Sequence, residues 1–139
     1  SHAVADVAAS RVPLLLGMDE IARDVAPALA ETDVFHRPYV VATNTLVIDD
    51  GELTIPADVA AMYAIAFACT LRVSRIWLAG FDGYVGQPDT PNTGMLQAEM
   101  EQFFRQLREW CAGAPGAPDI CSVLPTTYPV RQSSVYEYV

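Results

Sequence analysis

The feature that most constrains this chain is an apolar stretch that runs directly into a glycine-rich loop. Residues 76–79 lack the polar alternation of a half-exposed strand, which predicts a central strand buried on both faces, as in a parallel sheet. Asp82 follows, with Gly80 and Gly83 around it. Because ligands bind outside the carboxyl ends of strands in open α/β sheets, Asp82 is a candidate ligand-binding residue. The alternative is a turn in which Asp82 caps backbone amides, since turns favour both residue types.

Alternating strand and helix patterns predict an α/β sandwich with a largely parallel sheet. A nearly all-apolar helix is expected over 57–71, with Thr54 as its N-cap, and an amphipathic helix over 93–110. Shorter helices are expected over 3–10 and 18–30, and strands over 12–16, 39–42, 46–48, 76–79 and 119–124. The strands at 39–42 and 46–48 form either a hairpin, or a sheet strand whose Thr43–Thr45 loop lines a pocket.

Two polar loops should leave the same carboxyl edge of this sheet. Glycines in the first allow close backbone approach, and hydroxyls in the second provide neutral donors for a phosphate-bearing ligand. The candidate ligand-binding residues are Gly80, Asp82, Gly83, Tyr84, Asn92, Thr126, Thr127 and Tyr128.

Composition excludes several function classes. The 139 residues, 52% of them hydrophobic, suit one globular domain. A net charge of −9, with only 8 basic residues, argues against a nucleic-acid binder. No apolar run approaches the roughly 20 residues that cross a bilayer, and no signal peptide is visible, so we expect a cytoplasmic protein without membrane association.

Motifs that would name a reaction are missing. No GxGxxG follows a strand, and there is no P-loop or GxSxG elbow. His36 stands without a catalytic partner, and Asp49-Asp50 is more simply a turn than part of a metal site. The three cysteines are scattered and are expected to be reduced thiols. We therefore expect no metal and no cofactor, and no catalytic residue is assigned.

The run from Arg75 to Tyr84, followed by Asn92, Met95 and Gln97, resembles a Rossmann-like domain of bacterial surface-polysaccharide gene clusters. It is similar to the C-terminal domain of aldolase-type proteins whose N-terminal domain is like 4-hydroxy-2-oxovalerate aldolase and HMG-CoA lyase. The tails over 124–129 and 133–136 are also similar. More distant similarity extends to bacterial sialyltransferases and hydroxymethylpterin diphosphokinase-like proteins.

This resemblance implies a three-layer Rossmann-like sandwich with a mostly parallel sheet, over residues 1–139, excised from a larger protein. It implies a site for a nucleotide or nucleotide-sugar at the Asp82 edge, serving an attached or partner aldolase domain. The chain is too short for a (β/α)₈ barrel, which needs about 250 residues, so it holds no aldolase active site. The histidine base of the sialyltransferases has no counterpart.

Three hypotheses follow for the function. The first is a nucleotide or nucleotide-sugar binding domain accessory to an aldolase-type enzyme. The second is a glycosyl- or phosphotransferase in which Asp82 binds a metal or acts as a base. The third is a structural or dimerising module. A concave polar surface at the Asp82 edge favours the first two, and an exposed apolar patch favours the third.

Overall fold

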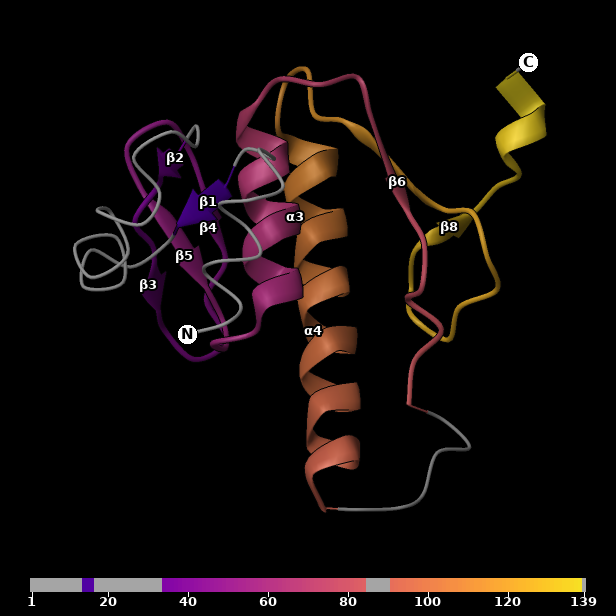
Figure 1. Ribbon diagram of the computed structural model, residues 1–139, viewed down its shortest axis with the longest axis horizontal. Helices are drawn as coiled ribbons and strands as arrows, with labels where there is room; N and C mark the ends of the chain where they lie inside the picture. Colours follow the sequence, from indigo (N-terminus) through magenta and orange to yellow (C-terminus); the bar gives the residue numbers. More distant parts are fainter. Residues whose placement is uncertain (1–13, 17–33, 85–90, 139) are drawn as a thin grey trace. The chain divides into compact units, whose positions relative to one another are not determined.

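The computed structural model describes residues 14–16, 34–84 and 91–138 of the chain (Figure 1). Contacts between Cα atoms divide it into two compact units, Ser1–Val40 and Val41–Val139, and each is described by itself. The helices expected over 3–10 and 18–30 lie outside the described residues. The expectation of a single domain stays a prediction.

The first unit contains one described pair of strands. Strand β1 (Leu14–Leu16) pairs in parallel with β2 (Val34–His36), and Leu14 lies opposite Val34. The apolar run over 12–16 therefore forms the expected strand at its C-terminal end. The β2 segment was not expected as a strand, because His36 and Arg37-Pro38 interrupt its short apolar pattern.

A small sheet of three strands begins the second unit. Its order is β3 (Val40–Val41), β5 (Leu53–Ile55) and β4 (Val47–Ile48), and β4 and β5 are antiparallel. A hairpin between the 39–42 and 46–48 strands is therefore wrong, since β5 lies between them. The Asp49 turn is confirmed: its Oδ1 accepts hydrogen bonds from the amides of Gly51 (2.8 Å) and Glu52 (2.5 Å).

The apolar helix α3 (Ala60–Thr70) packs against β4 and β5. Its N-cap is Val59, without a side-chain hydrogen bond, so the expected cap at Thr54 is wrong. Thr54 is instead buried in the middle of β5, because a β-branched residue between Leu53 and Ile55 completes an interior strand. The helix itself, predicted from its lack of charge, is confirmed with a later start.

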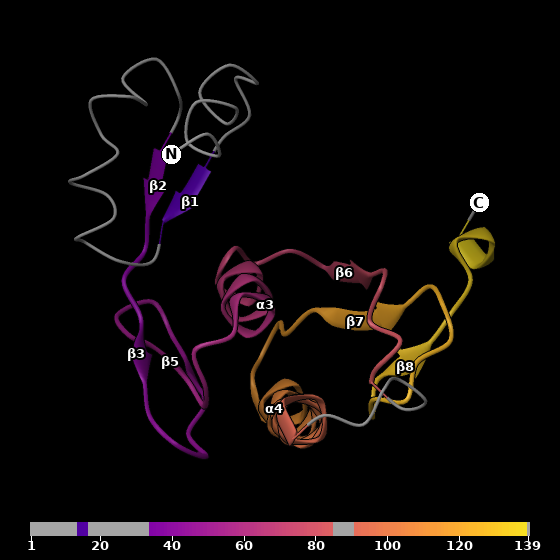
Figure 2. The ribbon, with the colours of Figure 1, turned by 60° about the horizontal axis from the view of Figure 1, so that its bottom comes forward.

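A parallel sheet forms the other half of this unit. Its order is β6 (Arg75–Leu78), β7 (Asp119–Ser122) and β8 (Arg131–Gln132), and a 3-10 helix, η2 (Val135–Tyr138), follows. The described residues thus mix helices with a small parallel sheet. Helix α4 (Pro91–Gly113) runs along one face of this sheet (Figure 2).

The prediction that residues 76–79 form a central strand buried on both faces is wrong. Strand β6 stands at the end of the order β6-β7-β8, and Trp77 is 39% exposed while Leu78 is 4% exposed. Within the described residues, helix α4 covers only one face of the sheet. The guanidinium of Arg75 lies 5.4 Å from the Trp77 ring centroid, and such a contact suits an aromatic side chain that stays partly in water.

Asp119 links the three parallel strands electrostatically. Its Oδ2 accepts hydrogen bonds from Arg75 Nε (3.3 Å) on β6 and from an Arg131 guanidinium nitrogen (2.7 Å) on β8. Partial burial opposes ionisation of Asp119, but hydrogen bonds from Arg131, Cys121 and Arg75 outweigh it and lower the pKa of the carboxyl.

The hydrophobic core gathers on α4, as its apolar stripe predicts. Met100, Phe103, Phe104 and Leu107 are buried, whereas Leu96 and Trp110 are half-buried. No helix among the described residues is long and apolar enough to cross a membrane. All three cysteines are free, and burial above all, with Cys111 nearby, raises the pKa of Cys69 to about 12.

Phe103 is fully buried, so we expect Phe103→Ala to lower the free energy of unfolding by about 3–5 kcal/mol. Met95 is on the same helix but 60% exposed, and Met95→Ala should change stability by less than about 0.5 kcal/mol. Urea unfolding measures both. Similar losses for the two variants would contradict this placement of the core.

Stability should also fall at alkaline pH through Cys69. Below the ordinary thiol value of 9.0 the folded and unfolded chains both carry the proton, whereas above it only the unfolded thiol ionises, until the folded pKa near 12 is reached. This contribution should cost about 1 kcal/mol by pH 10. Cys69→Ala should have lower stability at pH 8 but a shallower decline to pH 10. Urea titrations at both pH values measure the free energy of unfolding. An equal decline for the parent chain and Cys69→Ala would refute the contribution of Cys69.

Candidate functional site

The loop that follows β6 has a backbone shape that requires glycine at two positions. Gly80 has a φ of 77° and Gly83 a φ of 94°. A Cβ atom on Gly83 would also lie 2.0 Å from Thr127 Oγ1 and 3.1 Å from Gln97 Oε1. At Gly80 a Cβ would meet nothing within 4 Å. The loop is therefore packed tightly at Gly83 and open at Gly80.

The second predicted loop lies directly against the first. Both the amide and the hydroxyl of Thr127 donate to the carbonyl oxygen of Asp82, each at 3.2 Å. The Thr126 hydroxyl donates to the carbonyl oxygen of Phe81. The convergence of these two loops, predicted from the sequence, is confirmed.

Gln97 on α4 completes this contact, which we call the clasp (Gln97, Thr126 and Thr127 with the backbone of 81–84). Its Oε1 accepts a hydrogen bond from the Tyr84 amide (2.8 Å). Its Nε2 donates to Thr127 Oγ1 (3.2 Å) and to Glu101 Oε1 (2.8 Å). The side-chain amide thus holds the loop, the helix and the second loop in one arrangement.

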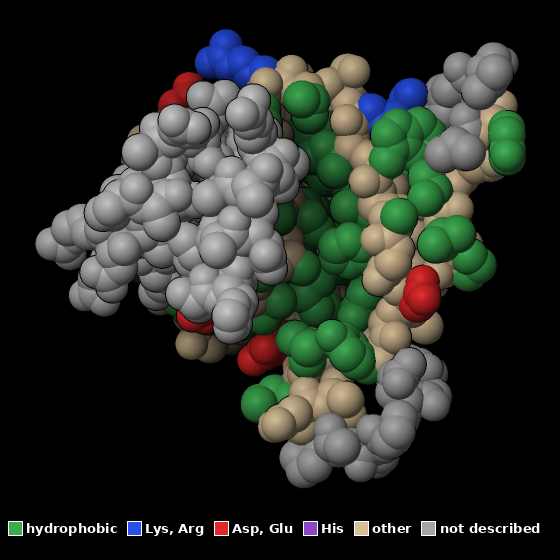
Figure 3. Space-filling model, viewed as in Figure 1, with side chains coloured by type: hydrophobic (Ala, Val, Ile, Leu, Met, Phe, Trp, Pro, Cys, Tyr) green, Lys and Arg blue, Asp and Glu red, His purple; other side chains and the backbone are tan. Residues whose placement is uncertain are grey.

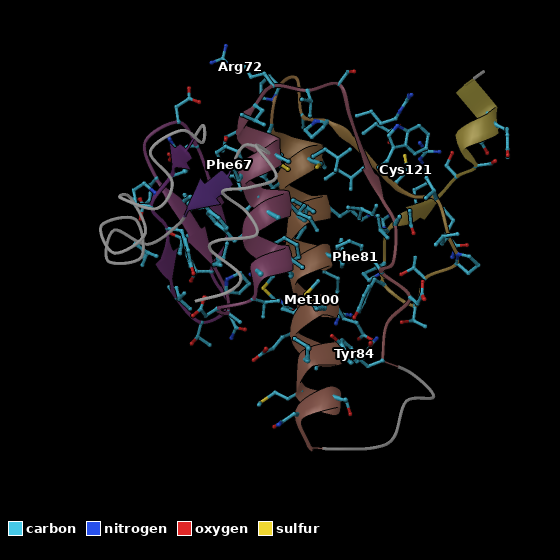
Figure 4. The ribbon with its side chains drawn as sticks, in the orientation of Figure 1. Phe67, Arg72, Phe81, Tyr84, Met100 and Cys121 are labelled. Atoms are coloured by element: carbon cyan, nitrogen blue, oxygen red, sulfur yellow. The ribbon has the colours of Figure 1, made fainter. Side chains whose placement is uncertain are left out.

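A pocket of about 490 Å³ opens beside the clasp, at the carboxyl end of β6. The loop contributes five consecutive residues to it, Gly80 to Tyr84. The other lining residues are Val59, Ala61, Leu96, Met100 and Tyr128. Figure 4 shows Phe81 and Tyr84 on the segment after β6, facing the helix that carries Met100. In Figure 3, hydrophobic side chains gather in the hollow between the helices and this segment.

Five of the eight residues expected at the site line this pocket: Gly80, Asp82, Gly83, Tyr84 and Tyr128. The hydroxyls of Thr126 and Thr127 bond to backbone carbonyls of the first loop instead. Their predicted role as donors to a phosphate is therefore not supported. Asn92 is exposed near the start of α4 and is not among the lining residues.

The side chain of Asp82 is exposed and makes no hydrogen bond or ion pair with any part of the chain that the structure describes. Only its backbone carbonyl is used, by Thr127. Among the described residues, the carboxylate caps no loop amide, and the capping alternative has no support there. The loop keeps its shape through the clasp, and the carboxylate is left available to the pocket.

Tyr128 lines the pocket from the second loop. It is 6% exposed, and its ring stacks on Phe104 with centroids 5.2 Å apart and planes 27° apart. Burial first, then nearby Tyr84 and Glu101, raise the pKa of the Tyr128 phenol, so it stays a neutral hydroxyl near pH 7.

The sequence pattern did not single out Gln97 or the apolar lining residues as part of a site. Gln97 fits the polar side of an amphipathic helix equally well, so its signal is lost among other polar residues. The paired glycines were the only indication that something approaches the loop closely. Leu96 and Met100 belong to the apolar stripe, which predicts core packing in any helix of this kind.

A second pocket, of about 570 Å³, lies between α4 and the β7–β8 region and includes Arg108 and Arg131. Across the described ranges, no three His, Cys, Asp or Glu side chains are grouped as ligands for a metal ion. Comparison of the chain with protein-family models, with curated proteins and with solved structures finds no match in any of the three.

Substitution of the two glycines should separate backbone strain from packing. Gly80→Ala incurs only the cost of positive φ, about 1–2 kcal/mol. Gly83→Ala should cost distinctly more, because its methyl group overlaps the Thr127 hydroxyl. The double variant Gly83→Ala/Thr127→Ala should be less destabilised than the sum of the single variants. Thermal unfolding measures these three variants and Thr127→Ala, and strict additivity would contradict the overlap.

Proposed function

We propose that this chain is a nucleotide or nucleotide-sugar binding domain that assists an aldolase-type enzyme of bacterial surface-sugar biosynthesis. The proposal includes a three-layer Rossmann-like sandwich and a cytoplasmic location. The parallel β6-β7-β8 sheet with α4 on one face supports the fold, and three free thiols suit a reducing compartment. The aldolase link is supported by the sequence resemblance around residues 75–84.

The observation that carries this proposal is the Asp82 carboxylate. It has no partner among the described residues, while the backbone of the same residue is fixed by Thr127, so the residue is positioned by its main chain and its carboxylate is not used in that contact. Carboxylates just beyond the carboxyl end of a strand accept hydrogen bonds from ribose hydroxyls in nucleotide-binding sheets. A pocket of about 490 Å³ is within the range that small ligands occupy.

The loop around Asp82 is also arranged as a binding loop rather than as a passive connection. Gly80 and Gly83 leave backbone without side chains at the pocket, which allows a ligand to approach closely. The clasp holds this backbone before any ligand arrives, so little ordering entropy is lost on binding.

Asp82→Asn tests this proposal. A thermal-shift screen with nucleotides and nucleotide-sugars identifies a ligand, because a compound that binds only the folded chain raises its melting temperature. Asp82→Asn should lower the affinity for that ligand about tenfold to a hundredfold, as expected for loss of a charge-assisted hydrogen bond. Without ligand its melting temperature should stay within about 2 °C of the parent, since no internal bond is lost.

Glu109→Gln is the matched control. It removes the same charge from an exposed position on α4 that does not line the pocket. It should leave both affinity and melting temperature unchanged. Equal affinities for the Asp82 and Glu109 variants, or failure of every compound in the screen to bind, would argue against the proposed function.

A further inference from the structure

We infer that the pocket beside β6 holds an uncharged, hydroxyl-bearing ring of the ligand, a ribose or a hexose, and leaves any phosphate outside. This inference rests on the proposed function and narrows it to one part of the ligand. It follows from the charges, the backbone amides and the surfaces that the lining residues present.

None of the described residues that line this pocket is basic. The chain has no lysine, and the arginine nearest to the lining along α4 is Arg105, whose guanidinium lies 3.7 Å from Glu101. Arg75 and Arg131 pair with Asp119 at the opposite end of the strands. A phosphate in the pocket would therefore meet the Asp82 carboxylate with no compensating cation from the described part of the chain.

One backbone amide of the loop is already used within the protein. Glycine-rich loops hold phosphates through several free amides, and the Tyr84 amide donates to Gln97 Oε1 at 2.8 Å, so it is not available to a phosphate. Helix α4 reaches the pocket with Leu96 and Met100, beyond its first turn. The amides of the helix N-terminus, which favour anions, therefore do not line it.

The lining is instead suited to a sugar ring. Asp82 offers carboxylate oxygens to hydroxyl donors, and the Tyr128 hydroxyl remains protonated at neutral pH. Phe81 and Tyr84 add aromatic surface, and Leu96 and Met100 add apolar surface for the carbon face of a ring. A carboxylate acceptor placed beside aromatic and aliphatic side chains orients a small polar ligand.

The test compares pairs of compounds that differ only by phosphate. Each of the common nucleosides is titrated against its 5′-monophosphate by calorimetry at low salt, and glucose, galactose and their 1-phosphates form the sugar series. At least one uncharged member should bind, and its phosphorylated counterpart should bind equally or up to about tenfold more weakly because of Asp82. Inorganic phosphate should not compete.

Two variants identify the groups responsible. Asp82→Asn should lower the affinity for the uncharged compound about tenfold. It should also reduce the difference in affinity between the uncharged compound and its phosphorylated counterpart. Tyr84→Leu keeps the backbone bond to Gln97 but removes the ring, and should weaken both members of a pair equally. Glu109→Gln should reproduce the parent in every titration.

The possible failures separate the two proposals. Phosphorylated compounds that bind more than tenfold tighter than their uncharged counterparts, or competition by inorganic phosphate, overturn this inference and leave nucleotide binding standing. Normal affinity of Asp82→Asn for the uncharged ring removes Asp82 from the contact and overturns it as well. If no nucleoside, nucleotide or sugar binds, the inference and the proposed function both fail.

Discussion

The packing around Phe104 is the interaction on which the pocket and its loops depend. This fully enclosed ring of α4 contacts Phe81 at 6.1 Å, Phe103 at 5.5 Å and Tyr128 at 5.2 Å between centroids. Phe81 comes from the loop after β6, and Tyr128 from the loop after β7. One aromatic side chain thus anchors both loops to the helix, and the polar clasp operates on backbone that this packing has already placed. Edge-to-face and stacked pairs of this kind add to the burial of apolar area.

The polar side chains at the site differ in whether they bond to the protein itself. The side chains of Gln97, Thr126 and Thr127 form hydrogen bonds within the protein, whereas the Asp82 carboxylate forms none with the described residues. A buried polar group without a partner costs about 1–3 kcal/mol, but an exposed carboxylate keeps its hydration and costs little. Asp82 can therefore remain free without destabilising the fold.

Local patterns in the sequence predicted which helices and strands form better than they predicted which of these elements lie side by side. The stripe on α4 and the charge-free run of α3 have strong helical periodicity, and both helices are present. The place of β6 at the end of its sheet was missed because an apolar run reports burial and not which strand lies beside it. The meeting of the 80–84 and 126–128 loops followed from the rule for parallel strands. The internal use of the threonine hydroxyls depended on atomic distances that composition does not encode.

The clasp has a kinetic consequence, because its bonds join residues far apart along the chain. The bonds from Thr126 and Thr127 to the first loop span 45 residues, and that from Gln97 to Thr127 spans 30. Long closures of this kind form late, after the ordering entropy of the intervening chain has been lost. During synthesis, moreover, residues 80–84 emerge well before their partners. The 80–84 loop can therefore take its final shape only after residues 126 and 127 have left the ribosome, so the pocket beside it stays incomplete until then.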